Sequence, residues 1–312
     1  MLDPAEKPYH DYGEYLKKRL GAKTYKVSVD GGFTCPNIDG TVAKGGCTYC
    51  NNRSFVPKYL SRKQSIQEQV QKGVERQRKR YKASQFLAYF QAYSNTYADV
   101  AELEQKYRAA LAVDGIVGLV VGTRADCLPE PVLDLLQEIA EEYYVALEIG
   151  VESIYDQTLE RINRGHRFYR VVDALERSQG RGFDIGTHFI FGLPGETRQD
   201  WLHTAEVINE LGMTYTKLHH LHVVKGTQLA RQYREEPFFT FTFKAWTELV
   251  ADLLERIDPQ IVIARMAGSA PPQLLIAPHW EQKGHGAVKQ QVARIMAERN
   301  TVQGQRLVLT PG

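Results

Sequence analysis

Short apolar runs alternate with longer segments of helical periodicity through most of the sequence, and this alternation restricts the fold more than any other feature. Six runs have the length and composition of buried strands, at residues 24–30, 85–91, 116–122, 144–151, 183–191 and 214–223. Helical patterns lie between them, at residues 65–81, 131–142, 169–179 and 197–211. Strands that alternate with helices form parallel sheets covered by crossover helices, so the sequence predicts an α/β protein.

Two arrangements of these units are compatible with the pattern. A partial (β/α)6 barrel, similar to a TIM barrel, is the simplest assembly, and an open doubly wound sheet competes with it because strand order cannot be read from one sequence. The pattern changes after residue 225. We therefore expect an N-terminal segment (1–23), a core (24–225) and a C-terminal extension (226–312) with helices at 243–257 and 286–300.

Composition restricts the class of protein. With 312 residues, of which 43% are hydrophobic, the chain can bury a core, and it has no run of about 18 apolar residues that would span a membrane. Four cysteines are a poor disulfide framework for this length. We therefore expect a cytoplasmic protein with reduced thiols and no membrane partner, in which clustered cysteines suggest a metal.

The segment CPNIDGTVAKGGCTYC holds three of the four cysteines, Cys35, Cys47 and Cys50, and begins shortly after the first predicted strand. Reacting groups in parallel α/β folds collect at the carboxyl ends of the strands, so this segment is a candidate site. Three thiolates leave one iron of a [4Fe–4S] cluster without a protein ligand, and that iron can bind another molecule. Zinc is the alternative, although closed zinc sites usually have four ligands and the segment contains no histidine.

The sequence resembles the radical S-adenosylmethionine (radical SAM) superfamily, and within it the YhcC/YtqA-type family. The segments that carry the resemblance occur in the expected order between about residues 25 and 280: DGGFTCPNIDG, GGCTYCN, YFQAYSNTYA, VGTRADCLP, RINRGH, FIFGLPGE and LHVVKGT. The first gap between cysteines has 11 residues where the usual superfamily signature has three. This departure is similar to the long-gap branch that includes the Elongator subunit Elp3.

The resemblance implies an enzyme with two cofactors. Cys35, Cys47 and Cys50 would bind a [4Fe–4S] cluster, and S-adenosylmethionine (SAM) would chelate the open iron. Such enzymes cleave SAM to a 5′-deoxyadenosyl radical that abstracts hydrogen from an unreactive C–H bond, while the protein supplies placement and excludes water. An electron donor such as a flavodoxin or a ferredoxin is implied as a partner.

Two segments at strand ends supply candidate SAM contacts. Gln91 and Ser94 follow the second strand, where related enzymes place a glycine-rich strap over the methionyl amine. On the fourth strand, alternation puts Glu148 and Glu152 on one face, and two buried carboxylates there would be costly unless they bind something. The resemblance suggests that Glu152 contacts SAM and that Glu148 meets its ribose or amine.

Two further SAM contacts are implied by the resemblance alone. Arg164, in RINRGH, matches an arginine that pairs with the SAM carboxylate in coproporphyrinogen-type relatives, and a guanidinium can bind a carboxylate with two hydrogen bonds. His188 falls where those enzymes often have an acidic residue near the ribose.

Three other features have simpler explanations. Cys127 is expected to be an inert, partly buried thiol and not a fourth cluster ligand. His219, His220 and His222 suit substrate hydrogen bonding or packing better than a metal site. The basic run RQRKRYK (76–82) is either a solvated helix end or, with Lys17, Lys18, Arg19, Arg62 and Lys63, a patch for a phosphate backbone.

For the substrate, the resemblance suggests tRNA, with remodelling of a carboxymethylaminomethyl group on the wobble uridine to an aminomethyl group. Radical oxidation or decarboxylation of a small molecule is the alternative enzyme function. A zinc-stabilised binding protein without turnover is the alternative outside enzymes.

Overall fold

The computed structural model describes residues 2–52, 60, 64–281 and 283–307 of the chain. Within them, seven strands form the main sheet and two more form a small ribbon. The strands of the main sheet are β1 (Thr24–Val29), β2 (Gln85–Phe90), β3 (Ile116–Arg124), β4 (Tyr144–Glu152), β5 (Asp184–Phe191), β6 (Tyr215–His220) and β8 (Val262–Arg265). The ribbon pairs β7 (Val223–Val224) with β9 (Leu275–Ala277).

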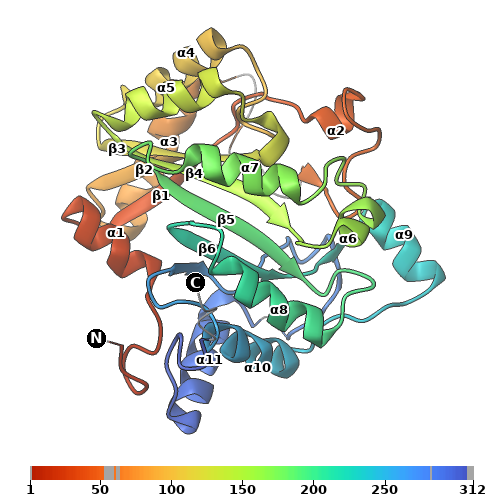
Figure 1. Cartoon of the computed structure of the whole chain (residues 1–312). Helices are drawn as coiled ribbons and strands as arrows, with labels where there is room; N and C mark the ends of the chain where they lie inside the picture. The colour runs from red at the N-terminus through yellow and green to blue at the C-terminus, as the bar shows by residue number, and fades with distance from the viewer. Residues whose placement is uncertain (1, 53–59, 61–63, 282, 308–312) are drawn as a thin grey trace.

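The strand order decides between the two expected arrangements. The main sheet has the order β1-β2-β3-β4-β5-β6-β8, and every neighbouring pair is parallel. A doubly wound sheet would reverse its strand order at one point, whereas this order runs in one direction from β1 to β8. The sheet therefore curls into the partial barrel that the alternation predicted, with helices outside it (Figure 1).

The six helices with predicted ranges begin and end close to those limits, and the described residues form five more helices for which no range was predicted. The helices are α1 (Tyr12–Leu20), α2 (Pro36–Asp39), α3 (Ile66–Tyr81), α4 (Val100–Leu111), α5 (Glu130–Ala140), α6 (Asp156–Arg161), α7 (Tyr169–Ser178), α8 (Arg198–Ile208), α9 (Gln228–Glu235), α10 (Phe243–Leu254) and α11 (His285–Arg299). Ser65 and Thr197 cap α3 and α8, and each accepts a hydrogen bond from the backbone of an acidic residue three positions on. These caps explain why both helices start where they do.

Alternate residues of each strand face opposite sides of the sheet. The outward residues, such as Leu147, Ile149 and Val151 of β4, are fully buried in the large core formed with the surrounding helices. The inward residues are more polar. For example, Glu148 on β4 forms ion pairs with Lys26 on β1 and Lys217 on β6 across the barrel. The barrel interior is therefore built for polar groups, except at its base.

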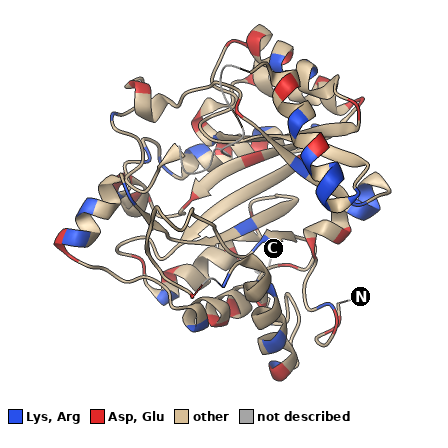
Figure 2. Cartoon of the chain, turned by 180° about the vertical axis from the view of Figure 1, so that it is seen from behind, with Lys and Arg blue, Asp and Glu red and all other residues tan. Residues whose placement is uncertain are grey.

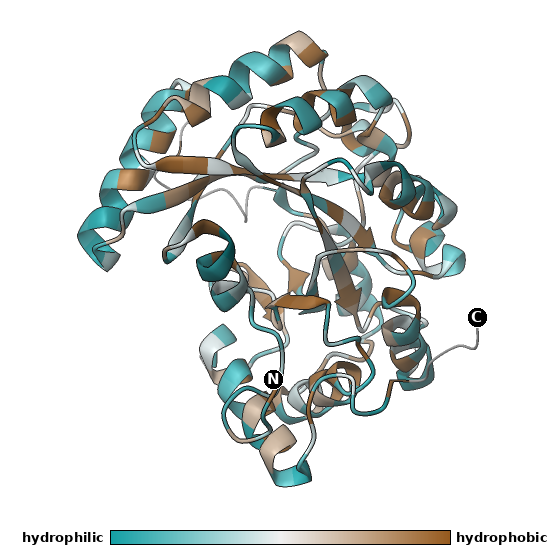
Figure 3. Ribbon diagram, turned by 60° about the vertical axis from the view of Figure 1, so that its left-hand side comes forward, coloured by the Kyte–Doolittle hydropathy of each residue, from teal (hydrophilic) through white to brown (hydrophobic). Residues whose placement is uncertain are grey.

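Helix α1 closes the amino-terminal end of the barrel. Tyr12 packs against Tyr215 with ring centroids 4.6 Å apart, within a small apolar cluster that also contains Leu87 and Val120. The Tyr144 hydroxyl and the nearby Tyr15 hydroxyl both donate to Asp184. Figure 3 shows α1 lying across the curled sheet at this end.

Three features of the fold differ from the sequence prediction. The short strand β8 was not predicted, and it extends the sheet beyond six strands into the segment assigned to the C-terminal extension. The last predicted strand is interrupted after His220: the Leu221 amide still donates to the Phe191 carbonyl of β5, and the chain then turns to pair β7 with β9. Within the part of the chain that the structure describes, no helix is both long and apolar enough to cross a membrane.

The basic run ends α3 at the amino-terminal edge of the sheet, far from the cysteine segment. Arg78 forms an ion pair of 2.7 Å with Asp114, which lies just before β3, and the last turn of α1 carries Lys17, Lys18 and Arg19. Figure 2 shows the blue bands of both helices on one side of the molecule. Arg62 and Lys63, which we had added to this patch, lie outside the described residues.

Candidate active site

The cysteine segment lies at the carboxyl end of the barrel, where the sequence places it. Cys35 directly precedes α2, and the segment folds back so that the Gly46 amide donates to the Asn37 carbonyl over 2.8 Å. Cys35 and Cys47 are each 8% exposed, while Cys50 is half-buried. Burial, followed by the charges of Cys47 and Cys35, raises the pKa of Cys50 well above its ordinary value. Cys50 therefore lies close enough to the other two thiols that its negative charge is disfavoured unless a cation joins them.

The RINRGH segment after α6 holds the cysteine segment in place. The Asn163 side chain donates to the carbonyls of Lys44 (3.0 Å) and Gly46 (2.8 Å), and the Asn37 side chain donates to the Asn163 carbonyl. Asn163 has a φ of 54°, a left-handed conformation that asparagine tolerates better than most residues. Asn37 and Asn163 were not identified from the sequence, although asparagine is enriched in this left-handed backbone conformation.

Replacing Asn163 by Ala should loosen the cysteine segment, because two carbonyls lose their donor. We expect about 1–3 kcal/mol lower stability in urea unfolding and reduced iron retention after anaerobic gel filtration. Asn209→Ala is the matched control, since Asn209 also bridges two backbone groups (at Arg256 and Asp258) but lies away from the cysteines. The control should lose similar stability and keep its iron; equal iron loss in both variants would refute the assigned role.

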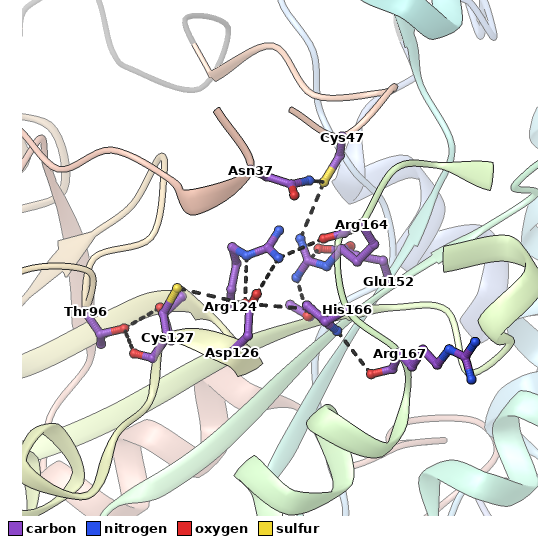
Figure 4. A network of polar contacts seen from close by, with 12 residues as sticks. Asn37, Cys47, Thr96, Arg124, Asp126, Cys127, Glu152, Arg164, His166 and Arg167 are labelled. Atoms are coloured by element: carbon purple, nitrogen blue, oxygen red, sulfur yellow. Dashed lines mark hydrogen bonds and ion pairs between the residues drawn. The ribbon is translucent and has the colours of Figure 1, made fainter. Parts of the chain in front are cut away.

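Two buried arginines surround the cysteines. Arg164 contacts the Gly150 carbonyl at 2.5 Å, the Cys47 sulfur at 3.8 Å and Glu152 at 3.7 Å. Burial opposes its charge, but Tyr49 and Glu152 raise the pKa of Arg164 above its ordinary value, so it stays charged. Figure 4 shows it between Cys47 and Glu152.

The second arginine, Arg124, was not identified from the sequence. It ends β3, forms a bidentate pair with Asp126 (2.8 and 2.7 Å) and also donates to the Arg164 carbonyl. Burial lowers the pKa of the neighbouring His166 to about 4, so this imidazole is neutral. The signal was the sequence TRAD directly after a strand, at the edge where sites form.

Glu152 occupies a strained position at the end of β4. The pairing of β4 with β5 shifts between Gly150 and Glu152, and Glu152 has a φ of 69°. Its Oε2 atom is buried and has no hydrogen-bond partner among the described residues. Backbone strain and an unpaired carboxylate oxygen are both costly, and they persist at binding sites because a ligand completes them.

The turn after β2 has the backbone conformation of a glycine-rich strap, although other residues stand where the glycines would be. Ala92 and Tyr93 have φ values of 65° and 64°, which glycine would adopt more easily. The Asn95 side chain fixes this turn by donating to the carbonyls of Ala92 and Gly122. Gln91 points into the barrel and donates to Ser28 over 2.7 Å.

The other predicted residues have the following surroundings. Ser94 is fully buried, its amide donates to the Thr34 carbonyl, and its hydroxyl lies beside Cys127. Burial and the nearby Asp126 raise the pKa of Cys127 to about 12, so this thiol stays protonated. His188 lies inside the barrel, 2.5 Å from the Nδ1 atom of His219.

A cavity of about 1190 Å³ opens beside the cysteine segment. Its walls combine aromatic and basic side chains, among them Phe33, Tyr97, Tyr169, Arg167 and Arg170. Tyr169 is 59% exposed, and the Arg170 guanidinium lies 5.2 Å from the centre of its ring.

Comparison with known proteins identifies the family. The sequence model of the radical SAM superfamily matches residues 40–208, which is more than half of the chain. The chain belongs to the radical SAM superfamily. A model of the radical SAM C-terminal domain matches residues 213–297. The first match includes Cys47 and Cys50 but begins after Cys35.

Individual relatives agree with this family. The chain is 37% identical to YtqA of Bacillus subtilis (88% of this chain, 85% of the relative) and 39% identical to YhcC of Escherichia coli (89% of each). A more distant relative is the tRNA uridine(34) acetyltransferase of Dehalococcoides mccartyi, 26% identical over 52% of this chain and 35% of the relative. The structure of Methanocaldococcus infernus Elp3 has the same fold, with a TM-score of 0.67 and 14% identity over 89% of this chain and 64% of Elp3.

As a radical SAM enzyme, the protein uses a [4Fe–4S] cluster and SAM, and this excludes the zinc-stabilised binding protein. Within the described residues, no three His, Cys, Asp or Glu side chains are arranged to hold a single metal ion. The site fits the two cofactors, because several buried polar atoms in the cysteine segment, at the carboxyl ends of the strands and after α6 have no hydrogen-bond partner among the described residues: Asn37 Oδ1, Asn95 Oδ1, Arg124 Nη1, Glu152 Oε2 and Arg164 Nε.

Both oxygens of Glu148 already have protein partners in this radical SAM enzyme. Lys26 Nζ lies 2.9 Å from Oε1, Tyr215 donates to the same oxygen, and Lys217 pairs with Oε2. These contacts provide a reason for its burial that does not require SAM. A contact of Glu148 with SAM stays a prediction.

Proposed function

We propose that this radical SAM enzyme acts on tRNA and remodels the carboxymethylaminomethyl group of the wobble uridine to an aminomethyl group. The cavity beside the cysteine segment is the observation that carries the proposal. Proteins that bind single-stranded RNA stack its bases on aromatic rings and arginine planes, and this cavity offers both. The relative named for tRNA uridine(34) supports the same substrate.

Cys35, Cys47 and Cys50 are the proposed cluster ligands, since they are the three clustered thiols at the carboxyl end of the barrel. When bound, the cluster and SAM supply a radical that abstracts hydrogen. Arg164 would hold the SAM carboxylate, with Glu152 at the SAM amine and Gln91, Ser94 and His188 around the rest of the molecule. The neutral imidazole of His188 can donate or accept a hydrogen bond there, because burial lowers its pKa.

The proposed substrate also indicates the cellular compartment of the enzyme and its electron donor. A tRNA-modifying enzyme that needs a reduced cluster would act in the cytoplasm and receive its electron from a flavodoxin or a ferredoxin. The decisive experiment compares nucleosides of tRNA from cells with and without the gene by mass spectrometry. In cells without the gene, carboxymethylaminomethyl uridine should accumulate in tRNA. If the tRNA nucleosides are unchanged, a small-molecule substrate is favoured instead.

Changing Tyr169 and Arg170 together to Ala should weaken tRNA binding about 10- to 100-fold, because a stacking surface and a cation are lost. Filter binding at fixed salt measures this, and 5′-deoxyadenosine formed without tRNA should not change. The matched control is Arg78→Ala with Lys79→Ala and Arg80→Ala, which removes more charge at the opposite end of the barrel. If the control variant loses more tRNA affinity than the Tyr169 and Arg170 variant, the RNA interface lies at the α3 end.

A further inference from the structure

The barrel interior holds more positive than negative charge. Glu148 (6% exposed) is shared by Lys26 (24%) and Lys217 (12%), which lie on opposite sides of it. Arg265 on β8 is next to Lys217 in the register of the sheet and is half-buried. The Arg265 side chain donates to Ser269 and has no carboxylate partner among the described residues. Three cations therefore share one carboxylate.

This excess of charge is concentrated at Lys217. Glu148 offsets the burial of Lys26 and raises the pKa of that ammonium. Burial lowers the pKa of Lys217 to about 8, because the attraction of Glu148 is opposed by Lys26 and Arg265. A buried cation that lacks a full partner is unfavourable, so the position favours an additional anion.

The charged wall lies next to the proposed SAM site. His188, Lys217 and Arg265 are register neighbours on β5, β6 and β8. On its other side, His188 is paired with Gly150, whose carbonyl accepts from Arg164. A Cβ on Gly150 would meet Glu152 Oε1 at 2.6 Å and Arg164 Nη2 at 2.9 Å, so these two side chains occupy the interior above Lys217. A substrate group that approaches Lys217 from the cysteine end would pass beside them.

We propose that Lys217 and Arg265 bind a carboxylate of the substrate inside the barrel, so that the group that reacts ends in an acid. The inference rests on the proposed function only in identifying this acid with the carboxymethyl end of the uridine side chain. The His219 Nε2 atom, which is buried and has no partner within the described part of the chain, is a further hydrogen-bonding group beside this wall.

Binding of a small acid tests the site without tRNA. The probes are N-methylglycine and its amide, titrated calorimetrically into the full-length, cluster-loaded protein. At pH 7 we expect the acid to bind at least about tenfold more tightly than the amide, and Lys217→Met to remove this preference. Lys289→Met is the matched control, because Lys289 is a half-buried lysine paired with Asp11 outside the barrel. Equal binding of acid and amide to the wild-type protein would overturn the proposal.

The preference should also depend on pH. Lys217 loses its proton above pH 8 while the acid stays charged, so the affinity for N-methylglycine should fall by up to about tenfold per pH unit above that value. The charged and titratable groups around Lys217 are Tyr215 and His219 on its own strand and Lys26, Tyr89, Glu148, His188 and Arg265 on the other strands. Lys217→Met should bind the acid with no such decline, and a decline that survives in the variant would contradict the assignment.

Turnover separates the inference from the proposed function. With tRNA that carries the acid, Lys217→Met and Arg265→Gln should each lower kcat/KM about 100-fold, but less than about threefold when the carboxylate is amidated. Acid-specific binding of N-methylglycine without any reaction on tRNA would refute the proposed function and leave the carboxylate site standing. Weaker binding of SAM itself in Lys217→Met would assign the anion to SAM and overturn the inference.

Discussion

Replacing Cys47 by Ala should reduce the formation of 5′-deoxyadenosine by more than about 1000-fold. Cys47 is buried and receives contacts from Asn37 (3.4 Å) and Arg164 (3.8 Å), so its sulfur lies at the centre of the site. A cluster that loses one of three thiolate ligands lacks a complete protein attachment. Liquid chromatography of anaerobic reactions with dithionite and SAM measures the product, and iron and sulfide analysis measures the cluster.

Cys127→Ala is the control for this result. It also removes a buried thiol, but that thiol stays protonated and lies beside Asp126 and Ser94 rather than beside Cys47. The variant should keep its iron and its activity. Product formation by Cys47→Ala at the wild-type rate would show that the ligands were assigned incorrectly, and iron loss in Cys127→Ala would make that residue a ligand.

Replacing Arg164 by Lys should weaken SAM binding about 30- to 100-fold. The lysine keeps a positive charge beside Glu152, but it cannot bind a carboxylate through two parallel hydrogen bonds or reach the Gly150 carbonyl at the same time. Removing the charge completely, as in Arg164→Met, would leave Glu152 unpaired and destabilise the fold by about 3–5 kcal/mol. Equilibrium dialysis of SAM with the cluster-loaded protein measures the affinity.

Arg124→Lys separates binding from stability. Arg124 is equally buried and also pairs with a carboxylate, at Asp126, so the two variants should lose similar stability in urea. SAM affinity should change less than about fivefold in Arg124→Lys. Equal losses of SAM affinity in the two variants would mean that Arg164 acts only by supporting the cysteine segment.

The fold was largely predictable because its strands are continuous apolar runs. Each of the six predicted strands of the main sheet is present, and the parallel order follows from their alternation with helices. β8 escaped detection because it has only four residues, VIAR, and its place in the sheet depends on pairing with β6. The break after His220 depends on the pairing of β7 with β9, about 50 residues further along the chain, which no local pattern contains.

The site was predictable where chemistry is concentrated in one segment, as in the cysteines. It was not predictable where it depends on residues far apart in the chain. Asn163 and Gly46 are separated by 117 positions, and Glu148 and Lys26 by 122. Alternation placed Glu148 inside the barrel correctly, but only the folded sheet brings two lysines to it. The sequence also left open whether the basic end of α3 is a solvated helix end or a phosphate patch, and this stays a prediction; the structure places it at the amino-terminal edge of the sheet, opposite the cysteines.

The tyrosine-rich base formed by α1 covers the amino-terminal end of the barrel. Under the proposed function, a reacting group would enter past the cysteines at the other end, and the product would have to withdraw there before another substrate arrives. For a nucleotide within a long RNA, this means that only the base and its appended side chain go in while the sugar and phosphates stay outside. The distance along β4 from Glu152 to Glu148, four strand residues or about 13 Å, then limits how long that appended side chain can be.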